Sequence, residues 1–317
     1  MRALRVVELG RPPVVADREP PAAADGQVPV DVLAAPITPL DLLCATGTSY
    51  FGQPATPYVP GVQGVGWAGG RLVWFPTSAG MAPGDGSMAE RAAVAEADLV
   101  PLPGGADPVG LAALGLSAVA AHMALTWRGE LAPGEQVIVL GAGGVVGQAA
   151  VQLARTAGAR RVIAGARSQA AQERAGKAGA DVVVALDTDD VDELARRFTA
   201  AADGPVDLVI DPLYGAPAAA AARTLRPHGR LVNLGSSAAE TCPIDSSTLR
   251  GRSLRLLGYT NNALTREQRA AAVTAVAEQA VRGALTVAHE EVPLADAGAA
   301  WQRQAEGSAT GRIVLRP

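Results

Sequence analysis

The chain has 317 residues, of which 49% are hydrophobic and 18% are charged, and its formal net charge is −4. This length and composition allow a large hydrophobic core, most simply in two domains, and the dispersed basic residues lead us to expect no nucleic-acid partner and no membrane partner. No leader-like start is recognised and no apolar run is expected to reach membrane-spanning length, so the sequence predicts a cytoplasmic protein.

The first part of the chain, residues 1–114, is rich in proline, glycine and short apolar runs. It lacks a regular alternation of helices and strands. Turn residues that interrupt short apolar runs are typical of irregular β structure. We therefore expect a β domain here.

A glycine-rich turn lies between an apolar run and an amphipathic stretch in residues 135–155, EQVIVLGAGGVVGQAAVQLAR. Residues 136–140 are expected to form a buried parallel strand, and the stretch after the turn is expected to form a helix. Free N–H groups and the positive end of the helix dipole bind an anion at such a helix start. A strand–turn–helix without a ligand is the alternative. The pattern predicts a dinucleotide-phosphate site formed by Gly141, Gly143, Gly144, Val145 and Val146.

The second predicted strand ends near Ala166, where an NAD enzyme usually places an acidic residue on the ribose diol. This chain instead has Arg167 and Ser168, which offer a guanidinium and a hydroxyl to a 2′-phosphate. These residues favour NADP(H). The alternative is that Arg167 is only solvated and that both dinucleotides bind. Arg174 and Lys177 lie later in the next helix, where solvated positions are expected, although both would add positive potential.

Further apolar runs alternate with helical stretches beyond the glycine turn, at residues 161–164, 181–185, 206–211, 230–235 and 254–258. Strands that alternate with helices favour a parallel sheet covered by helices. We therefore expect a doubly wound α/β domain of the Rossmann type over residues 115–260. Two helices and two strands are predicted in residues 261–317, which we expect to return to the first domain.

Segments spread over nearly the whole chain carry a family resemblance. They include MRALRVVELG, PITPLDLLCATGTSY, PYVPGVQGVG, GLSAVAAHMAL, DLVIDPLYGA, LRPHGRLVNLGSS and GRIVLRP. In this order they resemble the zinc-independent medium-chain dehydrogenases/reductases of the quinone oxidoreductase (zeta-crystallin-like) group. The resemblance implies a GroES-like catalytic domain from both ends of the chain, with the Rossmann domain inserted. It also implies NADPH as cofactor, a small-molecule quinone or enone as substrate, and a homodimer or larger homo-oligomer.

Zinc-dependent members of this superfamily need about three Cys, His or carboxylate ligands that converge on one metal. Where they carry Gly-His-Glu, this chain has Gly61-Val62-Gln63, and the region of the first cysteine ligand reads Thr38-Pro39-Leu40-Asp41. The only two cysteines, Cys44 and Cys242, do not replace this set. We therefore expect no metal site and a mechanism without zinc.

The resemblance also indicates substrate-side residues. Similar enzymes place a tyrosine after a Thr-Gly or Ser-Gly step, which matches Tyr50. Its phenol is expected to orient the substrate oxygen or relay a proton, and packing without a chemical role is the alternative. Thr38 stands where a family asparagine is common and keeps a hydroxyl donor. Asp41 completes the candidate set, either as a base or, as the alternative, by capping or bracing its segment.

Segment matches add further cofactor residues. Ser117 resembles a family threonine, and Asn233, Gly235 and Ser236 lie at a strand end expected to face the nicotinamide. Asp211 follows another strand, where it either contributes to the ligand site or fixes its own turn.

Three functions remain open on the sequence alone. The first is an NADPH-dependent reductase of quinones or activated alkenes. The second is a specialised biosynthetic enzyme on the same scaffold, such as an enoyl reductase, a dehydrogenase or a non-redox enzyme. The third is a non-catalytic NADPH-binding sensor or structural protein.

Overall fold

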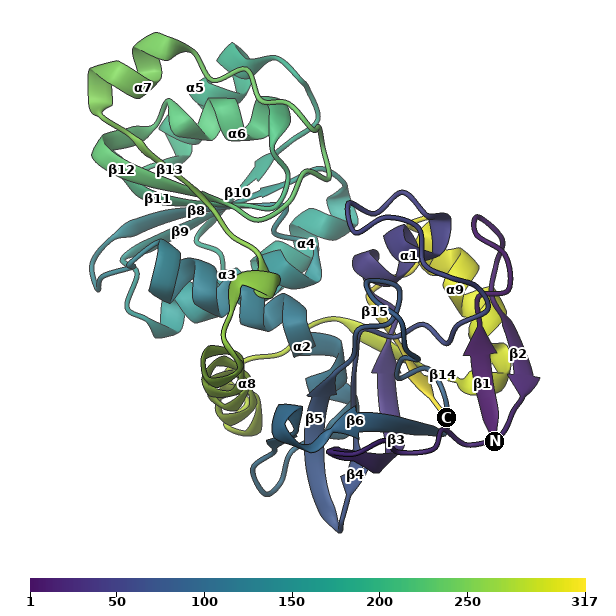
Figure 1. Cartoon of the computed structure of the whole chain (residues 1–317). Coiled ribbons are helices and arrows are strands. Elements are labelled where there is room, and N and C mark those ends of the chain that lie inside the picture. The colour runs from purple at the N-terminus through teal and green to yellow at the C-terminus, as the bar shows by residue number, and fades with distance from the viewer. The chain divides into compact units, whose positions relative to one another are not determined.

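The computed structural model describes residues 1–317, which divide into two compact units (Figure 1). The first unit contains residues 1–115, 266–283 and 287–317, and the second contains residues 116–265 and 284–286. Residues 261–265 and 284–286 thus belong to the second unit, whereas the sequence placed all of 261–317 in the first. The fold class is α/β, as predicted.

The second unit is built on six parallel strands in the order β10-β9-β8-β11-β12-β13. Their bounds are β8 Gln136–Leu140, β9 Arg161–Ala166, β10 Val182–Ala185, β11 Val206–Asp211, β12 Leu225–Asn233 and β13 Arg255–Gly258. Strand order reverses between β8 and β11, as in doubly wound dinucleotide-binding folds, so ligands are expected at the carboxyl ends of these two strands. The predicted Rossmann architecture is confirmed.

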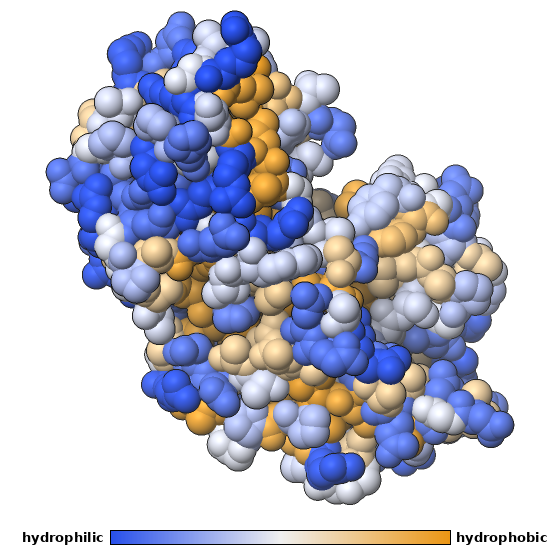
Figure 2. All heavy atoms as spheres, turned by 60° about the vertical axis from the view of Figure 1, so that its left-hand side comes forward, coloured by the Kyte–Doolittle hydropathy of each residue, from blue (hydrophilic) through white to orange (hydrophobic).

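Helices cover both faces of this sheet, with α3 and α4 on one face and α5 and α6 on the other (Figure 1). They are α3 Val145–Thr156, α4 Gln169–Lys177, α5 Val191–Ala201 and α6 Gly215–Ala222, and α7 Ser246–Arg252 follows β12. Because both faces are covered, every residue of β8 is buried. Hydrophilic side chains dominate the face of this unit seen in Figure 2, where an apolar strip interrupts them.

The first unit contains a seven-stranded sheet in the order β14-β15-β3-β4-β5-β7, with β6 also paired to β3. The bounds are β3 Gln27–Pro36, β4 Gln63–Ala68, β5 Arg71–Pro76, β6 Arg91–Ala95, β7 Val100–Pro101, β14 His289–Pro293 and β15 Arg312–Arg316. A separate pair is formed by β1 Arg2–Arg5 and β2 Val14–Asp17. Strand β15 lies between β14 and β3, so distant parts of the chain complete one sheet.

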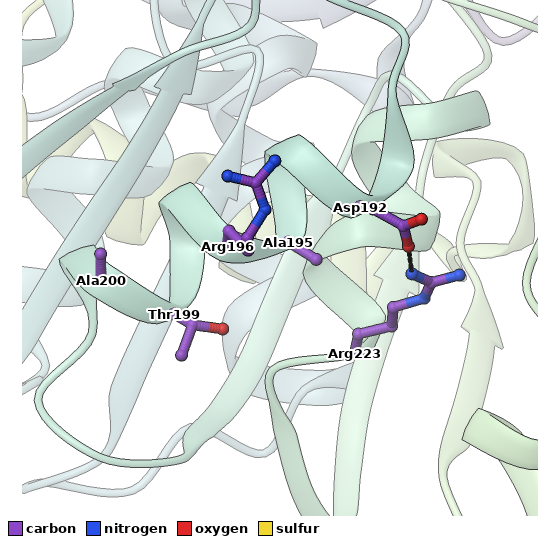
Figure 3. A pocket seen from close by; sticks show the side chains of 6 residues that line it. All are labelled: Asp192, Ala195, Arg196, Thr199, Ala200 and Arg223. Atoms are coloured by element: carbon purple, nitrogen blue, oxygen red, sulfur yellow. Dashed lines mark hydrogen bonds and ion pairs between the residues drawn. The ribbon is translucent and has the colours of Figure 1, made fainter.

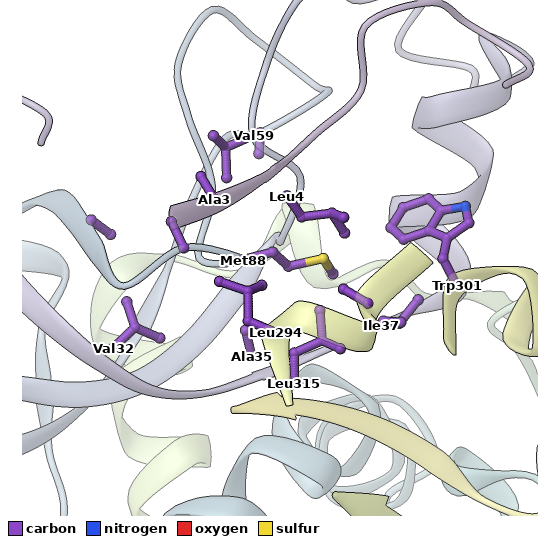
Figure 4. Close-up of a cluster of buried hydrophobic side chains, with 14 of the residues drawn as sticks. Ala3, Leu4, Val32, Ala35, Ile37, Val59, Met88, Leu294, Trp301 and Leu315 are labelled. Atoms are coloured by element: carbon purple, nitrogen blue, oxygen red, sulfur yellow. The ribbon is translucent and has the colours of Figure 1, made fainter. Parts of the chain in front are cut away.

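The core of the first unit joins the two ends of the chain (Figure 4). Leu4, Ile37 and Met88 from the first part are fully buried together with Leu294 and Leu315 from the last part. This burial stabilises the unit only when both parts are in place. The unit also contains α1 Pro39–Thr46, α8 Arg266–Val281 and α9 Ala297–Ala305.

Helix α2 (Pro108–Met123) continues into a π-helical turn, η2 (Ala124–Arg128). Together these 21 residues are long and apolar enough to span a membrane by length and composition. The expectation that no apolar run reaches this length is therefore wrong. Packing accounts for the apolar residues, because 72% of the most apolar window is buried inside the protein. The helix is also interrupted at Gly115, whose φ of 35° and ψ of −138° are not helical.

Candidate functional site

The glycine turn joins β8 to α3 at the carboxyl end of the central strand. Gly144 is the N-cap of α3, and no side chain caps this helix start. By contrast, the start of α4 is capped by Ser168, whose hydroxyl accepts a hydrogen bond from the Ala171 amide at 3.2 Å. The first turn of α3 also lacks an acidic residue. Its amides, among them those of Val145 and Val146, are therefore placed to bind an anion.

Gly143 is the most tightly packed residue of this turn. A Cβ at this position would lie 2.4 Å from the Ala171 Cβ, so only glycine fits. The Gly143 carbonyl oxygen accepts hydrogen bonds from Gln148 Nε2 at 3.0 Å and from Arg174 Nε at 2.9 Å. The turn is therefore held from α3 and from α4. Gln148 was not among the residues predicted from the sequence, where a glutamine one turn into the helix after a glycine turn is the available signal for such a contact.

The turns that follow β8 and β11 lie side by side. A Cβ on Gly141 would lie 3.0 Å from Leu213 Cδ2 and 3.2 Å from Pro212 Cγ. Asp211 fixes the β11 turn, because its Oδ1 accepts hydrogen bonds from the amides of Leu213 at 2.9 Å and Tyr214 at 2.8 Å. Burial raises the pKa of Asp211, and these hydrogen bonds partly offset the rise. The contacts favour the turn-fixing alternative for Asp211.

The carboxyl end of β12 lies at the same edge of the sheet as the turns after β8 and β11. Asn233 Nδ2 donates to Asp211 Oδ2 at 2.9 Å and to the Gly235 carbonyl at 2.8 Å. The amide hydrogens of Asn233 are thus used inside the turn, and a role as donor to a cofactor would require breaking these bonds. Ser236 is exposed beside it.

Arg167 and Ser168 lie at the carboxyl end of β9, where both are exposed. Arg167 makes no ion pair, and Ser168 keeps its own hydroxyl hydrogen while it caps α4. Gln172 holds this turn through bonds from Nε2 to the carbonyl oxygens of Ala166 and Arg167, at 3.4 and 3.2 Å. Ser117 lies in α2, two residues after the interruption at Gly115, and is half-buried.

The substrate-side candidates lie on and after α1 of the first unit. Thr38 is the N-cap of α1, and its hydroxyl donates to Asp41 Oδ2 at 2.6 Å while accepting from the Asp41 amide at 3.3 Å. Thr38 is also buried, with 5% of its surface exposed. The expectation of a hydroxyl hydrogen available to substrate is therefore corrected, because this hydrogen is bound to Asp41.

Asp41 braces α1 against a second segment. Its Oδ1 accepts hydrogen bonds from the amides of Gly61 at 3.0 Å and Val62 at 2.9 Å, and Oδ2 also accepts from the Thr38 amide at 2.8 Å. Burial raises the pKa of this carboxyl, and the hydrogen bonds act in the opposite direction. Because both oxygens are occupied, the geometry favours the bracing alternative over a base.

Tyr50 differs from the buried Thr38 and Asp41, because 77% of its surface is exposed. It lies in the turn after α1, and its ring centroid is 4.3 Å from that of Phe51, with the planes tilted by 35°. The amide of Phe51 donates to Ser49 Oγ at 3.3 Å, which helps to shape this turn. The phenol is thus accessible to a small molecule.

The residues present do not fit a zinc ion. Gln63 Oε1 accepts a hydrogen bond from Trp74 Nε1 at 3.0 Å, and Cys44 is buried, which raises the pKa of its thiol. No group of three or more His, Cys, Asp or Glu side chains is arranged to hold a metal ion.

A separate surface pocket lies on the second unit and carries none of the predicted site residues (Figure 3). Arg223 and Asp192 form an ion pair at its edge. It is lined by Asp192, Ala195, Arg196, Thr199, Ala200 and Arg223. Five of these residues lie on α5, and Arg223 follows the end of α6.

Comparison with known proteins agrees with this geometry. The family model for zinc-binding dehydrogenases matches residues 145–278. The quinone oxidoreductase of Rattus norvegicus is 32% identical over 250 residues, which cover 74% of this chain and 73% of the relative. That of Pongo abelii is 30% identical over 99% of this chain and 97% of its own length. The solved quinone oxidoreductase of Thermus thermophilus, described also as its complex with NADPH, is 30% identical, with a TM-score of 0.79 and full coverage of both chains.

Proposed function

Because the chain belongs to the quinone oxidoreductase family of medium-chain dehydrogenases/reductases, we propose that it is an NADPH-dependent, zinc-independent reductase of quinones or α,β-unsaturated carbonyls. The observation that carries the proposal is the uncapped start of α3 behind a tightly packed glycine turn. This arrangement is complementary to a dinucleotide pyrophosphate. The Thermus thermophilus relative, which was also solved as a complex with NADPH, supports the choice of cofactor.

The cofactor would be held mainly by backbone groups of the second unit. The amides at the start of α3 and the glycine turn would bind the pyrophosphate, while Arg167 and Ser168 would bind the 2′-phosphate. When bound, NADPH supplies a hydride from its nicotinamide ring. Residues assigned to the nicotinamide end are Ser117, Asn233, Gly235 and Ser236, with Asn233 acting through the turn that it shapes.

Tyr50 is assigned to the substrate. An acceptor that takes hydride at carbon gathers negative charge on oxygen, and a positioned hydrogen-bond donor stabilises that charge. Quinones and enones spread the charge by conjugation, so a phenol donor can serve in place of a Lewis acid. Thr38 and Asp41 are positioning residues, because they hold α1, which leads into the Tyr50 turn.

The proposed independence from zinc rests on the side chains that stand at the metal-ligand positions of zinc-dependent relatives. The segment Gly61-Val62-Gln63 offers no metal-binding side chain at Val62, and the Gln63 amide oxygen is bound to Trp74. We expect activity to survive exhaustive chelation and to gain nothing from added zinc.

We also propose a cytoplasmic homodimer. The second unit ends its sheet at β13, an edge strand whose Leu256 is 43% exposed, and Trp127 of the same unit is 39% exposed. Exposed apolar groups beside an unpaired strand edge favour pairing with another chain. The mass in solution, measured by light scattering after size exclusion, tests this assembly.

Stopped-flow oxidation of NADPH and NADH across a panel of quinones and enones, with chelator present, tests the activity. Rapid oxidation of NADPH in preference to NADH is the expected result. Tight NADPH binding without turnover on any acceptor would contradict the generic reductase and favour a dedicated biosynthetic substrate or a sensor. Absence of NADPH binding would overturn the proposal as a whole.

A further inference from the structure

Arg174 reaches from α4 to the glycine turn. Its Nε donates to the Gly143 carbonyl oxygen at 2.9 Å. Ala171, one helical turn earlier on the same face, packs against Gly143. Long side chains on a helix point toward its N-terminus, so the guanidinium lies along the first turns of α4, which Ser168 caps. The sequence predicted a solvated position for Arg174, whereas the structure places it half-buried against the glycine turn.

The charge of Arg174 has no carboxylate partner. Two other arginines of the same unit are paired with carboxylates: Arg155 with Asp181 at 2.7 Å, and Arg230 with Glu135 at 2.6 Å. Arg174 forms no ion pair, and the adjacent Glu173 accepts instead from Gln169 at 3.3 Å. Arg174 is also half-buried, so its charge is less hydrated than that of a fully exposed arginine. Four N–H donors remain on its two terminal nitrogens.

Support of the glycine turn alone does not account for a cation here. Gln148 already donates to the same Gly143 carbonyl from α3, at 3.0 Å. A neutral amide on α4 would supply a second bond of this kind. The Arg174 guanidinium is held by Gly143 through Nε only, and its two terminal nitrogens keep their hydrogens. Such a group is suited to bind a phosphate.

We propose that Arg174 binds the ribose 2′-phosphate of NADP(H) and so determines the preference of this chain for the phosphorylated dinucleotide. The inference rests on the proposed NADPH-dependent function. Arg174 belongs to the helix that begins at Ser168, directly after Arg167, and it touches the turn that packs against this helix. Because the Nε bond holds the guanidinium in place before the phosphate arrives, less side-chain entropy is lost on binding.

The experiment measures dissociation constants of NADPH, NADH, adenosine 2′,5′-bisphosphate and 5′-AMP for the full chain and for Arg174→Gln. Glutamine can keep a bond to Gly143 but removes the charge. We expect the dissociation constants of NADPH and of the bisphosphate to rise roughly tenfold to a hundredfold, with those of NADH and 5′-AMP unchanged within about twofold. Arg174→Lys should restore part of the affinity, and Arg174→Gln should reduce the salt dependence of NADPH binding.

Lys177→Gln is the matched control, because it removes one positive charge from the same helix at an exposed position. It should leave the ratio of NADPH to NADH affinity unchanged. An equal loss of NADPH and NADH affinity in Arg174→Gln would overturn the inference in favour of a pyrophosphate contact or turn support. Unchanged affinities for both NADPH and NADH in Arg174→Gln would overturn it as well. If the unaltered protein binds neither dinucleotide, the proposed function itself fails and the inference falls with it, whereas normal NADPH preference in Arg174→Gln defeats the inference alone.

Discussion

The hydroxyl of Thr38 lies 2.6 Å from Asp41 Oδ2, and the other oxygen of the same carboxylate receives the amides of Gly61 and Val62. One buried carboxylate therefore connects the start of α1 with a segment twenty residues further along the chain. The Thr38 hydroxyl is part of this connection, so its direct role is to stabilise the first unit and not to take part in hydride transfer.

Thr38→Val should therefore lower the free energy of unfolding by about 1–2 kcal/mol, because it removes the N-cap and one hydrogen bond to a buried carboxylate. Thr38→Ser keeps the hydroxyl and should stay within about 0.5 kcal/mol of the unaltered protein. Urea unfolding measures both variants. A Thr38→Val protein of normal stability that binds NADPH but does not turn over would instead indicate direct contact with substrate.

Removal of the exposed Tyr50 hydroxyl should reduce kcat. We expect Tyr50→Phe to lower kcat about tenfold to a hundredfold for enone acceptors, because the developing oxyanion loses a donor. The dissociation constant of NADPH should not change. Tyr58→Phe is the control, since it removes a tyrosine hydroxyl from a buried position in the same unit. Equal kcat in Tyr50→Phe and the unaltered enzyme would assign Tyr50 to packing.

The Tyr58 hydroxyl is buried without a hydrogen-bond partner, and burial raises its pKa further above the usual range. A buried unsatisfied hydroxyl destabilises a fold because its hydration is lost without replacement. Tyr58→Phe should consequently increase the free energy of unfolding by about 1 kcal/mol. Tyr50→Phe, where the hydroxyl is exposed, should show no such gain. A decrease in the stability of Tyr58→Phe would show that the hydroxyl has a partner in solution.

Glu135 should make the second unit sensitive to acid. Burial by itself raises the pKa of Glu135, but hydrogen bonds from the nearly buried Arg230 outweigh this and hold the pKa below the ordinary 4.5. A carboxyl with a lowered pKa stabilises the fold above its ordinary pKa, and this stabilisation is lost as pH falls through the lowered value. Stability should therefore decline below about pH 4.5.

Glu135→Gln should flatten this acid decline and lower stability at pH 7 by about 3 kcal/mol, because Arg230 loses its buried partner. Glu130→Gln is the control, since it breaks only the exposed pair with Arg255 and should change stability by less than about 0.5 kcal/mol. Thermal unfolding from pH 3 to pH 8 measures both variants. An unchanged pH profile in Glu135→Gln would contradict the assignment.

Gly143→Ala should abolish dinucleotide binding, because the added Cβ would lie 2.4 Å from the Ala171 Cβ and would push α4 away from the turn. Gly176 in α4 has open space around it, so Gly176→Ala should leave binding intact and stabilise the helix by about 0.5–1 kcal/mol. Fluorescence titration with NADPH checks both variants. Normal binding by Gly143→Ala would contradict the proposed location of the phosphate.

Local patterns predicted much of the fold. The strand at residues 136–140 and the strand at residues 206–211 have the bounds of β8 and β11, because a buried strand followed by glycine or a polar turn leaves a strong local signal. Strand β12 was harder, since it begins at Leu225 and passes through Pro227 and Gly229 before its regular part. Those residues locally indicate a turn, and pairing with β11 overrides them.

The side-chain network of the site was less predictable. The partners of Asp41 lie about twenty residues away at Gly61 and Val62, and Arg174 meets Gly143 across 31 positions. No spacing rule connects such pairs, because the contacts arise only after the sheet and helices have packed. The exposed position of Tyr50 and the bound hydroxyl hydrogen of Thr38 are consequences of the same packing.

The place of β15 between β14 and β3 imposes an order on folding during synthesis. Arg312 donates to the carbonyl of Ile37, 275 positions earlier, and β15 pairs with β3 at Val314 and Leu315. The six strands β8 to β13 all leave the ribosome before β15, so the parallel sheet can form while the first unit still lacks an inner strand. A nascent chain stalled before Arg312 therefore exposes the unpaired edges of β14 and β3, so this interval is the one in which the chain is most exposed to edge-to-edge aggregation.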